Sequence, residues 1–225
     1  MPTDFNRFKL TYTLIFINIL VYILTALLSA DPVSISPRVL VAFGALYGPL
    51  VLVYDEWWRL FTAMFLHGGM THIMMNMFSL YIVGRPIELY FSRWSYLAIY
   101  LFSGLMGAIA SLYMHPQSVG VGASGAIFGI FGAIAGFFIV YKKIIGSQSK
   151  EFMKNFAVVI AINLFLGLSI PSIDMSAHIA GLVVGIIGGV ILAKHPRRIM
   201  LFTVAMSVIL VISGFYLKQL YTLIP

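Results

Sequence analysis

Long stretches without Asp, Glu, Lys or Arg alternate with short polar segments along most of the chain. Each stretch is long enough for a membrane-spanning helix, which needs about 20 mostly apolar residues to cross about 30 Å of hydrocarbon. The uncharged stretches are Leu10–Ala30, Leu60–Gly84, Trp94–Tyr141, Asn155–Ile173, Met175–Ala193 and Ile199–Leu217. The pattern therefore predicts an all-α membrane protein, a polytopic helical bundle.

The stretch Trp94–Tyr141 has 48 residues, which is too long for one helix. It is interrupted by Met114-His115-Pro116-Gln117 and by Gly120-Val121-Gly122, and proline and glycine end helices. We therefore expect two helices here and seven spans in total. The alternating segments of about 10 residues that a β-barrel would need are not found. We expect a single membrane domain over residues 1–225, with a six-helix core at 10–193 and an additional helix at 199–217.

The composition agrees with this pattern, because 61% of the residues are hydrophobic and only 9% are charged. A soluble domain has about 25% charged residues, so a soluble globular fold is excluded. The absence of cysteine excludes disulfides, thiolate nucleophiles and cysteine-based metal sites. In a chain this apolar, the net charge of +7 indicates membrane topology rather than nucleic-acid binding.

The distribution of positive charge predicts the orientation. Of the 14 Lys and Arg residues, eleven lie in the N-terminal arm and in the loops after the second, fourth and sixth spans. The alternate loops and the C-terminus hold only Arg38, Arg59 and Lys218. Because positive residues are enriched in cytoplasmic loops, we expect the N-terminus in the cytoplasm and the C-terminus outside a cell membrane. The first span is longer than the core of a signal peptide, so we expect it to be an uncleaved anchor.

Four polar residues fall within or at the start of predicted spans, where such groups are costly and usually functional. His72 and Asn76 are four residues apart on one helix face, and they lie in the outer half of the second span if that span begins after Gly68-Gly69. Ser124 opens the fourth span, and His178 lies in the first turns of the sixth. These three spans run in the same direction, so we expect the four side chains at similar depth on the outer side.

Glycine spacing indicates how the fourth and sixth spans meet, because small residues every three or four positions let helix backbones approach closely in lipid. These glycines are Gly125, Gly129, Gly132 and Gly136 in one span and Gly181, Gly185 and Gly189 in the other. Helix packing alone explains the spacing, but a close contact would also bring Ser124 towards His178. A serine hydroxyl becomes a nucleophile when a base lies beside it, and a helix start offers N–H groups to a developing oxyanion.

Several short motifs contain these residues or lie near them in the chain. They are Trp58-Arg59, His67-Gly-Gly-Met-Thr-His72-Ile-Met-Met-Asn76, Gly84 to Glu88, Gly122-Ala-Ser124-Gly125, and Ala177-His178-Ile-Ala-Gly181-Leu-Val-Val-Gly185. Together and in this order they resemble the rhomboid intramembrane serine proteases. The resemblance covers about Leu10 to Ala193, and the seventh span is similar to the extra C-terminal helix of some members.

The resemblance implies a catalytic dyad of Ser124 as nucleophile and His178 as general base. It also implies an oxyanion hole made by His72, Asn76 and the backbone N–H of Ser124. The implied activity is hydrolysis of a peptide bond in or next to the transmembrane segment of a membrane-protein substrate.

Other positions have supporting roles by the same resemblance: His67, Gly122, Gly125, Phe128 and Gly181. Phe128 stands where the family commonly has an aromatic residue packed against the base. Trp58, Arg59 and Glu88 are expected to be structural. Asp174 precedes His178 by one turn, and we interpret it as a carboxylate at a helix start rather than a third catalytic residue.

The sequence leaves other classes to be weighed. A zinc protease could use His67, His72 and His178, although the His-Glu-x-x-His motif is missing. An aspartyl protease lacks a second carboxylate, and the clustering of ionisable groups at one face disfavours a transporter. The remaining alternative is a catalytically silent rhomboid-like protein that binds or sorts membrane clients. We expect no metal, cofactor or nucleic-acid partner; the expected partners are transmembrane substrates and the lipid bilayer, and nothing indicates an oligomeric state.

Overall fold

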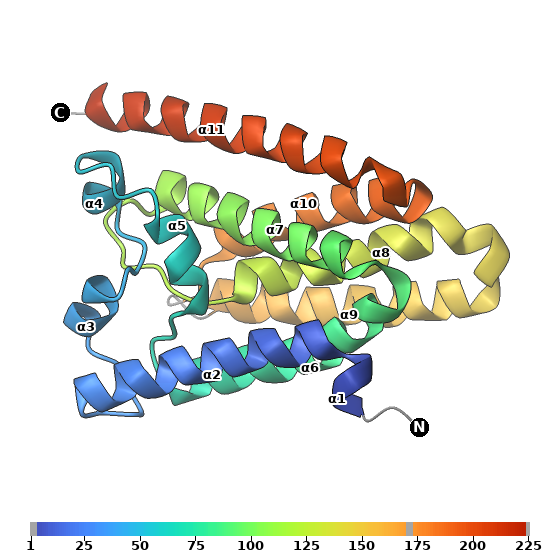
Figure 1. The fold of residues 1–225 in the computed structure, drawn as a ribbon, viewed down its shortest axis with the longest axis horizontal. Coiled ribbons are helices and arrows are strands. Elements are labelled where there is room, and N and C mark those ends of the chain that lie inside the picture. The colour runs from blue at the N-terminus through green and yellow to red at the C-terminus, as the bar shows by residue number, and fades with distance from the viewer. Residues whose placement is uncertain (1–3, 170–172, 224–225) are drawn as a thin grey trace.

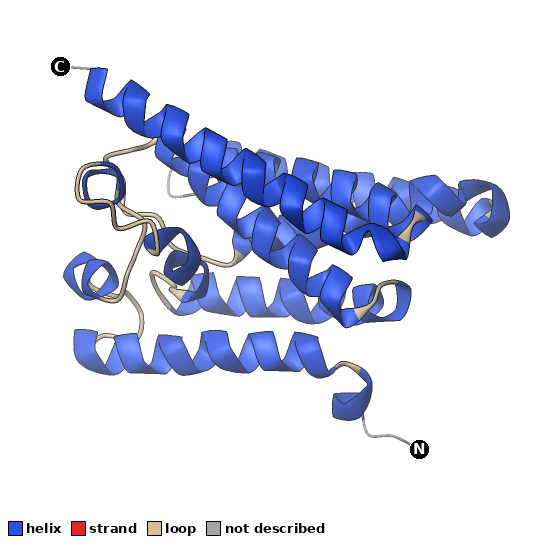
Figure 2. Cartoon of the chain, turned by 45° about the horizontal axis from the view of Figure 1, so that its top comes forward, coloured by secondary structure: helices blue, strands red, loops and turns tan. Residues whose placement is uncertain are grey.

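The computed structural model describes residues 4–169 and 173–223, which are mainly helical and contain no strand beyond two isolated bridges (Figure 1, Figure 2). The long helices are α2 (Lys9–Ser29), α6 (Met70–Tyr90), α7 (Arg93–Met114), α8 (Ser124–Ile145), α9 (Ser147–Ser169), α10 (Met175–Lys194) and α11 (Ile199–Leu223). The short ones are α1 (Asp4–Arg7), α3 (Pro37–Ala42), α4 (Gly48–Leu52), α5 (Arg59–Thr62) and the 3-10 turns η1 (Ala63–Phe65) and η2 (Pro196–Arg198). The predicted all-helical bundle is confirmed.

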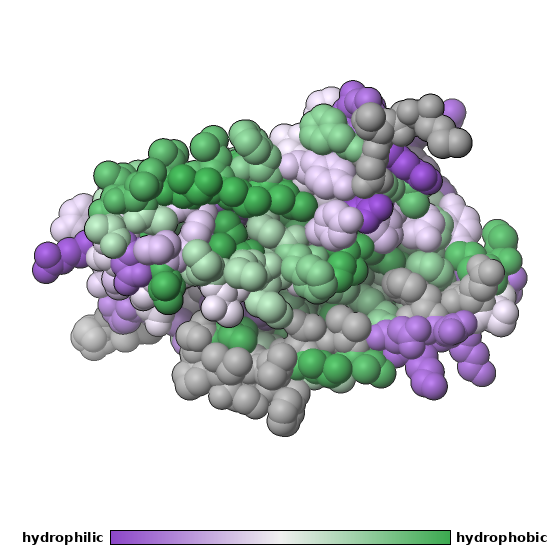
Figure 3. All heavy atoms as spheres, turned by 90° about the horizontal axis from the view of Figure 1, so that it is seen from below, coloured by the Kyte–Doolittle hydropathy of each residue, from purple (hydrophilic) through white to green (hydrophobic). Residues whose placement is uncertain are grey.

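Five of the described helices are long and apolar enough to cross a membrane, namely α2, α7, α8, α10 and α11. Helix α6 has the length but contains His72, Asn76, Arg85 and Glu88. The surface matches this assignment, since the face seen from below is broadly hydrophobic and its strongly hydrophilic residues gather mainly toward the ends (Figure 3).

Several predicted helix boundaries were wrong. The uncharged stretch of the second span starts at Leu60, but residues 60–65 form α5 and η1, and α6 begins at Met70, directly after Gly68-Gly69. Leu60 and Ala63 are apolar because they are buried in a small core that the first loop forms with α7 and α11, not because they face lipid. At the other end α6 continues past Gly84 to Tyr90, since a helix can extend beyond the point where charges begin.

The same extension occurs elsewhere. Helix α8 runs on to Ile145, α9 begins at Ser147, eight residues before the predicted Asn155, and α11 continues to Leu223. The predicted end of the fifth span falls beside residues 170–172, which lie outside the described residues. The predicted break inside Trp94–Tyr141 is confirmed, because α7 ends at Met114 and α8 begins at Ser124.

Helices α8 and α10 lie in backbone contact. A β-carbon at Gly181 would lie 2.0 Å from the carbonyl oxygen of Gly125, and one at Gly185 would lie 1.9 Å from that of Gly129. Both distances are too short for any side chain, so glycine is required for this approach. The close packing predicted from the glycine spacing is confirmed.

The first loop, residues 30–69, gathers with α3, α4 and α5 at one end of the bundle (Figure 1). Helices α6, α8 and α10 all begin at this end, so His72, Ser124 and His178 are close to the same end of the bundle, as the alternation of spans predicted. The last turns of α11 reach the same end, where the Gln117 amide donates a 3.0 Å hydrogen bond to the Tyr221 hydroxyl.

The α8–α10 contact generates a stability prediction. Gly185→Ala should lower the free energy of unfolding by about 1–3 kcal/mol, because its methyl group must push two backbones apart. Gly188→Ala on the same helix is the matched control and should cost less, since its β-carbon would lie 3.0 Å from the Phe202 ring and 3.1 Å from the Ile99 side chain, which can adjust. Thermal unfolding in detergent measures both, and equal melting temperatures would contradict the prediction.

Candidate active site

Ser124 stands at the first residue of α8, at the end of an extended segment that the first loop holds in place. The N–H of Gly122 donates a 2.9 Å hydrogen bond to the carbonyl of Ala63. Two residues earlier, Gly120 pairs with Leu46 through backbone hydrogen bonds of 2.8 and 2.9 Å. These contacts fix the backbone that leads into the half-buried Ser124.

His72 and Asn76 reach this segment from α6. A β-carbon at Gly122 would lie 2.8 Å from His72 Nε2 and 3.7 Å from Asn76 Nδ2, so both polar side chains face the backbone just before Ser124. Gly122 also has φ of +127°, a conformation that side chains disfavour. The close approach and the backbone conformation both explain why glycine occupies this position.

His178 reaches the start of α8 from α10. Its ring stacks on the ring of Phe128, one turn after Ser124, with centroids 4.3 Å apart and planes inclined by 11°. A β-carbon at Gly125, which follows Ser124, would lie 3.4 Å from the carbonyl of Ala177, which precedes His178. The chain neighbours of Ser124 and His178 are therefore in contact, and the aromatic packing expected at Phe128 is present.

The Rhomboid domain family matches residues 54–195, which contain every residue of the candidate site. The chain belongs to the rhomboid family. This confirms the resemblance carried by the motifs around Ser124 and His178.

Individual relatives are similar over most of this rhomboid. The chain is 38% identical to Rhomboid protease GluP of Bacillus subtilis over 80% of its length. It is 40% identical to RHOMBOID-like protein 6, mitochondrial, of Arabidopsis thaliana over 72%. It is 33% identical to Rhomboid protease AarA of Providencia stuartii over 84%. The match covers 34% of GluP, 52% of RHOMBOID-like protein 6 and 75% of AarA, so this chain spans only part of the first two.

His67 is fully buried beside the site. Its ring lies 5.0 Å from the ring of His72 in an edge-on arrangement, and neither of its nitrogens has a hydrogen-bond partner among the described residues. The position is consistent with the expected supporting role. No group of three or more His, Asp or Glu side chains that could hold a metal ion is found in the part of the chain that the structure describes.

Asp174 caps the start of α10. Its carboxylate accepts hydrogen bonds from the backbone N–H of Ser176 at 3.0 Å and of Ala177 at 3.2 Å. Burial raises the pKa of this carboxyl, but hydrogen bonds from Ser111, Ser176 and Ala177, with the charge of His115, outweigh it and leave the pKa below its usual value. The interpretation of Asp174 as a helix-start carboxylate is confirmed.

Two residues expected to be structural make the contacts that this role requires. The Arg59 guanidinium donates to the carbonyls of Val41 at 2.7 Å and Ala45 at 3.1 Å, which fixes the first loop. The Glu88 carboxylate accepts from the N–H and the hydroxyl of Thr11, both at 2.7 Å, which ties the end of α6 to the start of α2.

Sequence reasoning missed two groups that organise the site. The Ala63 carbonyl holds Gly122, and the Ser111 hydroxyl donates to the carboxylate of Asp174. The first contact uses backbone atoms only, so no residue type marks it. The second uses a common serine in a helix, whose partner is apparent only when α7 and α10 are side by side.

Two substitutions of Asp174 separate the contribution of its hydrogen bonds from that of its charge. Asp174→Ala should lower the free energy of unfolding by about 1 kcal/mol, because two N–H groups of α10 lose their acceptor. Asp174→Asn should retain most of that stability at neutral pH, since an amide oxygen also caps a helix. Because the folded pKa is depressed, the contribution of the charge is present above about pH 4 and is lost below it. Unfolding midpoints of the wild-type protein and both variants, measured at pH 7 and at about pH 3, test this. An Asn variant as unstable as Ala at pH 7 would contradict it.

Proposed function

We propose that this rhomboid is an intramembrane serine protease that hydrolyses a peptide bond in or next to the transmembrane segment of membrane-protein substrates. The observation that carries the proposal is the stacking of His178 on Phe128, one turn from Ser124. Two protease-named relatives, GluP and AarA, support the same activity.

In the proposed mechanism the Ser124 hydroxyl attacks the substrate carbonyl while His178 accepts its proton. His178 then returns the proton to the leaving amine, and water hydrolyses the acyl-enzyme. In a triad a carboxylate orients the imidazole, but Nδ1 of His178 has no hydrogen-bond partner among the described residues. Stacking on Phe128 supplies the orientation instead, which supports a dyad.

The oxyanion that forms during attack needs donors directed at the reacting carbonyl. We propose His72, Asn76 and the backbone N–H of Ser124 for this role. The approach of both side chains to Gly122 supports it, and the N-terminus of the 22-residue α8 adds a positive dipole end.

A substrate helix must unwind locally before cleavage, because an intact helix keeps its carbonyls in hydrogen bonds. We therefore propose that substrates contain helix-weakening residues near one membrane boundary. The predicted orientation makes this the outer boundary of a cell membrane, with the N-terminus cytoplasmic and the C-terminus outside. We retain the single-domain division into a core at 10–193 and an added helix at 199–217.

Cleavage of a membrane-anchored reporter by the purified full chain in liposomes tests the proposal. Ser124→Ala and His178→Ala should each lower the rate by about 10⁴-fold or more, because the dyad acts as a unit. Ser103→Ala is the matched control, since Ser103 is a buried serine on α7 whose hydroxyl has no partner among the described residues. It should cleave at the wild-type rate. Full activity in Ser124→Ala would overturn the dyad. No cleavage by the wild-type protein would instead favour a catalytically silent client-binding rhomboid.

The oxyanion assignment has its own test. His72→Ala and Asn76→Ala should each lower kcat by about 10²–10³ with a smaller change in KM, because the lost donor acts mainly in the transition state. Asn18→Ala is the control for Asn76, since it removes another buried amide, on α2, whose Nδ2 donates to the Leu14 carbonyl. Wild-type kcat in both site variants would overturn the assignment.

A further inference from the structure

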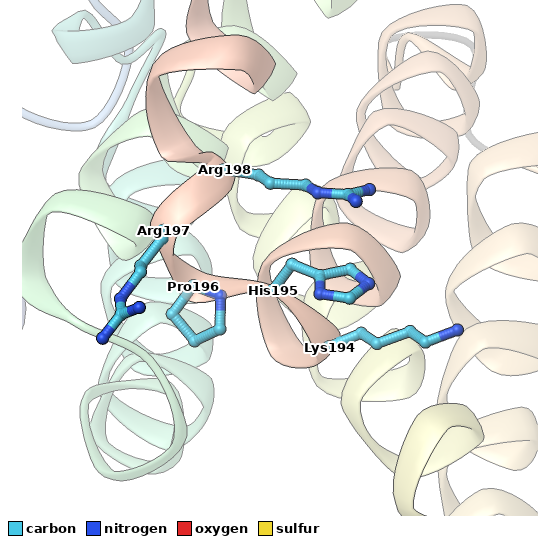
Figure 4. Close-up of a pocket in the computed structure, with 5 residues that line it drawn as sticks. All are labelled: Lys194, His195, Pro196, Arg197 and Arg198. Atoms are coloured by element: carbon cyan, nitrogen blue, oxygen red, sulfur yellow. The ribbon is translucent and has the colours of Figure 1, made fainter.

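The turn between α10 and α11 forms a basic cavity at the end of the bundle opposite the candidate active site. It has a volume of about 360 Å³ and is lined by Lys194, His195, Pro196, Arg197 and Arg198. Figure 4 shows the side chains of Lys194, His195 and Arg198 extending to the same side of the turn, while Arg197 extends to the other. Three nitrogen-bearing side chains therefore face one space.

The charge of these cations is not balanced by an ion pair among the described residues. Lys194, Arg197 and Arg198 are exposed, and no carboxylate among the described residues pairs with any of them. Desolvation, together with the charges of Arg198 and Lys194, lowers the pKa of His195, as expected where positive groups crowd. The Tyr141 hydroxyl donates a 2.9 Å hydrogen bond to the carbonyl of Ala193, which brings the basic last turn of α8 to the same place. The cluster is therefore suited to an anion.

The position of the turn identifies the source of that anion. Both α10 and α11 are long and apolar enough to cross a membrane, so the four residues between them must lie at a membrane boundary, at the level of the lipid headgroups. By the Lys and Arg count this boundary is cytoplasmic, where anionic lipids attract basic segments.

The face of α10 below the cavity is suited to acyl chains. Ile179, Val183 and Ile187 recur every four residues and are 50, 49 and 48% exposed. At 100° per residue, Lys194 falls on the same helix face as these three side chains. A cationic group therefore stands at the end of an exposed apolar stripe, which matches the head and tails of a phospholipid and not a free phosphate ion.

We propose that the α10–α11 turn binds the phosphate headgroup of one anionic phospholipid, held by Lys194, His195 and Arg198, with its acyl chains along Val183 and Ile187, the residues of the stripe nearest the turn. This site is separate from the candidate active site and does not depend on the proposed protease activity.

Native mass spectrometry of the full chain in detergent, titrated with phosphatidylglycerol or phosphatidylcholine, tests the proposal. The wild-type protein should retain one phosphatidylglycerol at least about tenfold more tightly than phosphatidylcholine. Lys194→Gln/Arg198→Gln should weaken phosphatidylglycerol binding by about 30-fold, roughly fivefold for each charge removed. The matched control Lys150→Gln/Lys154→Gln removes two exposed charges from α9 and should change binding by less than about twofold.

A second pair keeps the test informative if the double variant fails to fold. Arg198→Gln should weaken binding severalfold, whereas Arg197→Gln should not, because its guanidinium extends away from the other cations. The site would be overturned if Arg197→Gln weakened phosphatidylglycerol binding as much as Arg198→Gln. It would also be overturned if the two double variants weakened binding equally, because the attraction would then be spread over the surface. The lipid assignment would also be overturned if inorganic phosphate displaced phosphatidylglycerol at equal concentration, or if the wild-type protein bound both lipids equally.

Discussion

Direct backbone contact between α8 and α10 is the constraint on which the rest of this rhomboid depends. In lipid, apolar side chains gain little by leaving their surroundings, so helices associate through close packing. Here Gly125 and Gly129 meet Gly181 and Gly185 with no space for a side chain between them. The same contact fixes the start of each helix relative to the other, and Ser124 and His178 stand at those starts.

The first loop supplies what two packed helices cannot. A helix fixes a side chain only in relation to its own axis. Helix α6 packs less closely on α10 than α8 does, so another segment must set its position. Hydrogen bonds from Gly122 to Ala63 and between Gly120 and Leu46 tie the entrance of α8 to the loop. A bridge between Ser34 and Gly69 ties the entrance of α6 to the same loop. One extramembrane segment therefore sets the relative positions of His72 and Ser124.

The two ends of the bundle have different chemistry. At one end, the polar side chains of the candidate active site are buried or half-buried, and backbone hydrogen bonds and the Phe128 ring hold them in fixed positions. At the other, Lys194 and Arg198 are exposed and unpaired among the described residues, a setting suited to binding anions at the membrane surface. The apolar helices between them keep these two environments apart.

The sequence by itself determined the helical class, the alternation of helix direction and the glycine-mediated pair. Each of these follows from a local property. The length of a stretch without charge predicts a helix, the ordinal number of a span sets its direction, and small residues at a helical repeat predict the close pair. The sequence also selected Ser124, His178, His72 and Asn76, because polar groups are expensive in lipid and their motifs match a known family. The length of the uncharged stretch alone misplaced the start of α6, since burial between the first loop, α7 and α11 and exposure to lipid both select apolar residues. Only the tertiary structure decided which groups surround Ser124, because the Ala63 carbonyl, the conformation of Gly122 and the stacking of Phe128 on His178 join segments far apart in the chain, and such contacts leave no periodic signal.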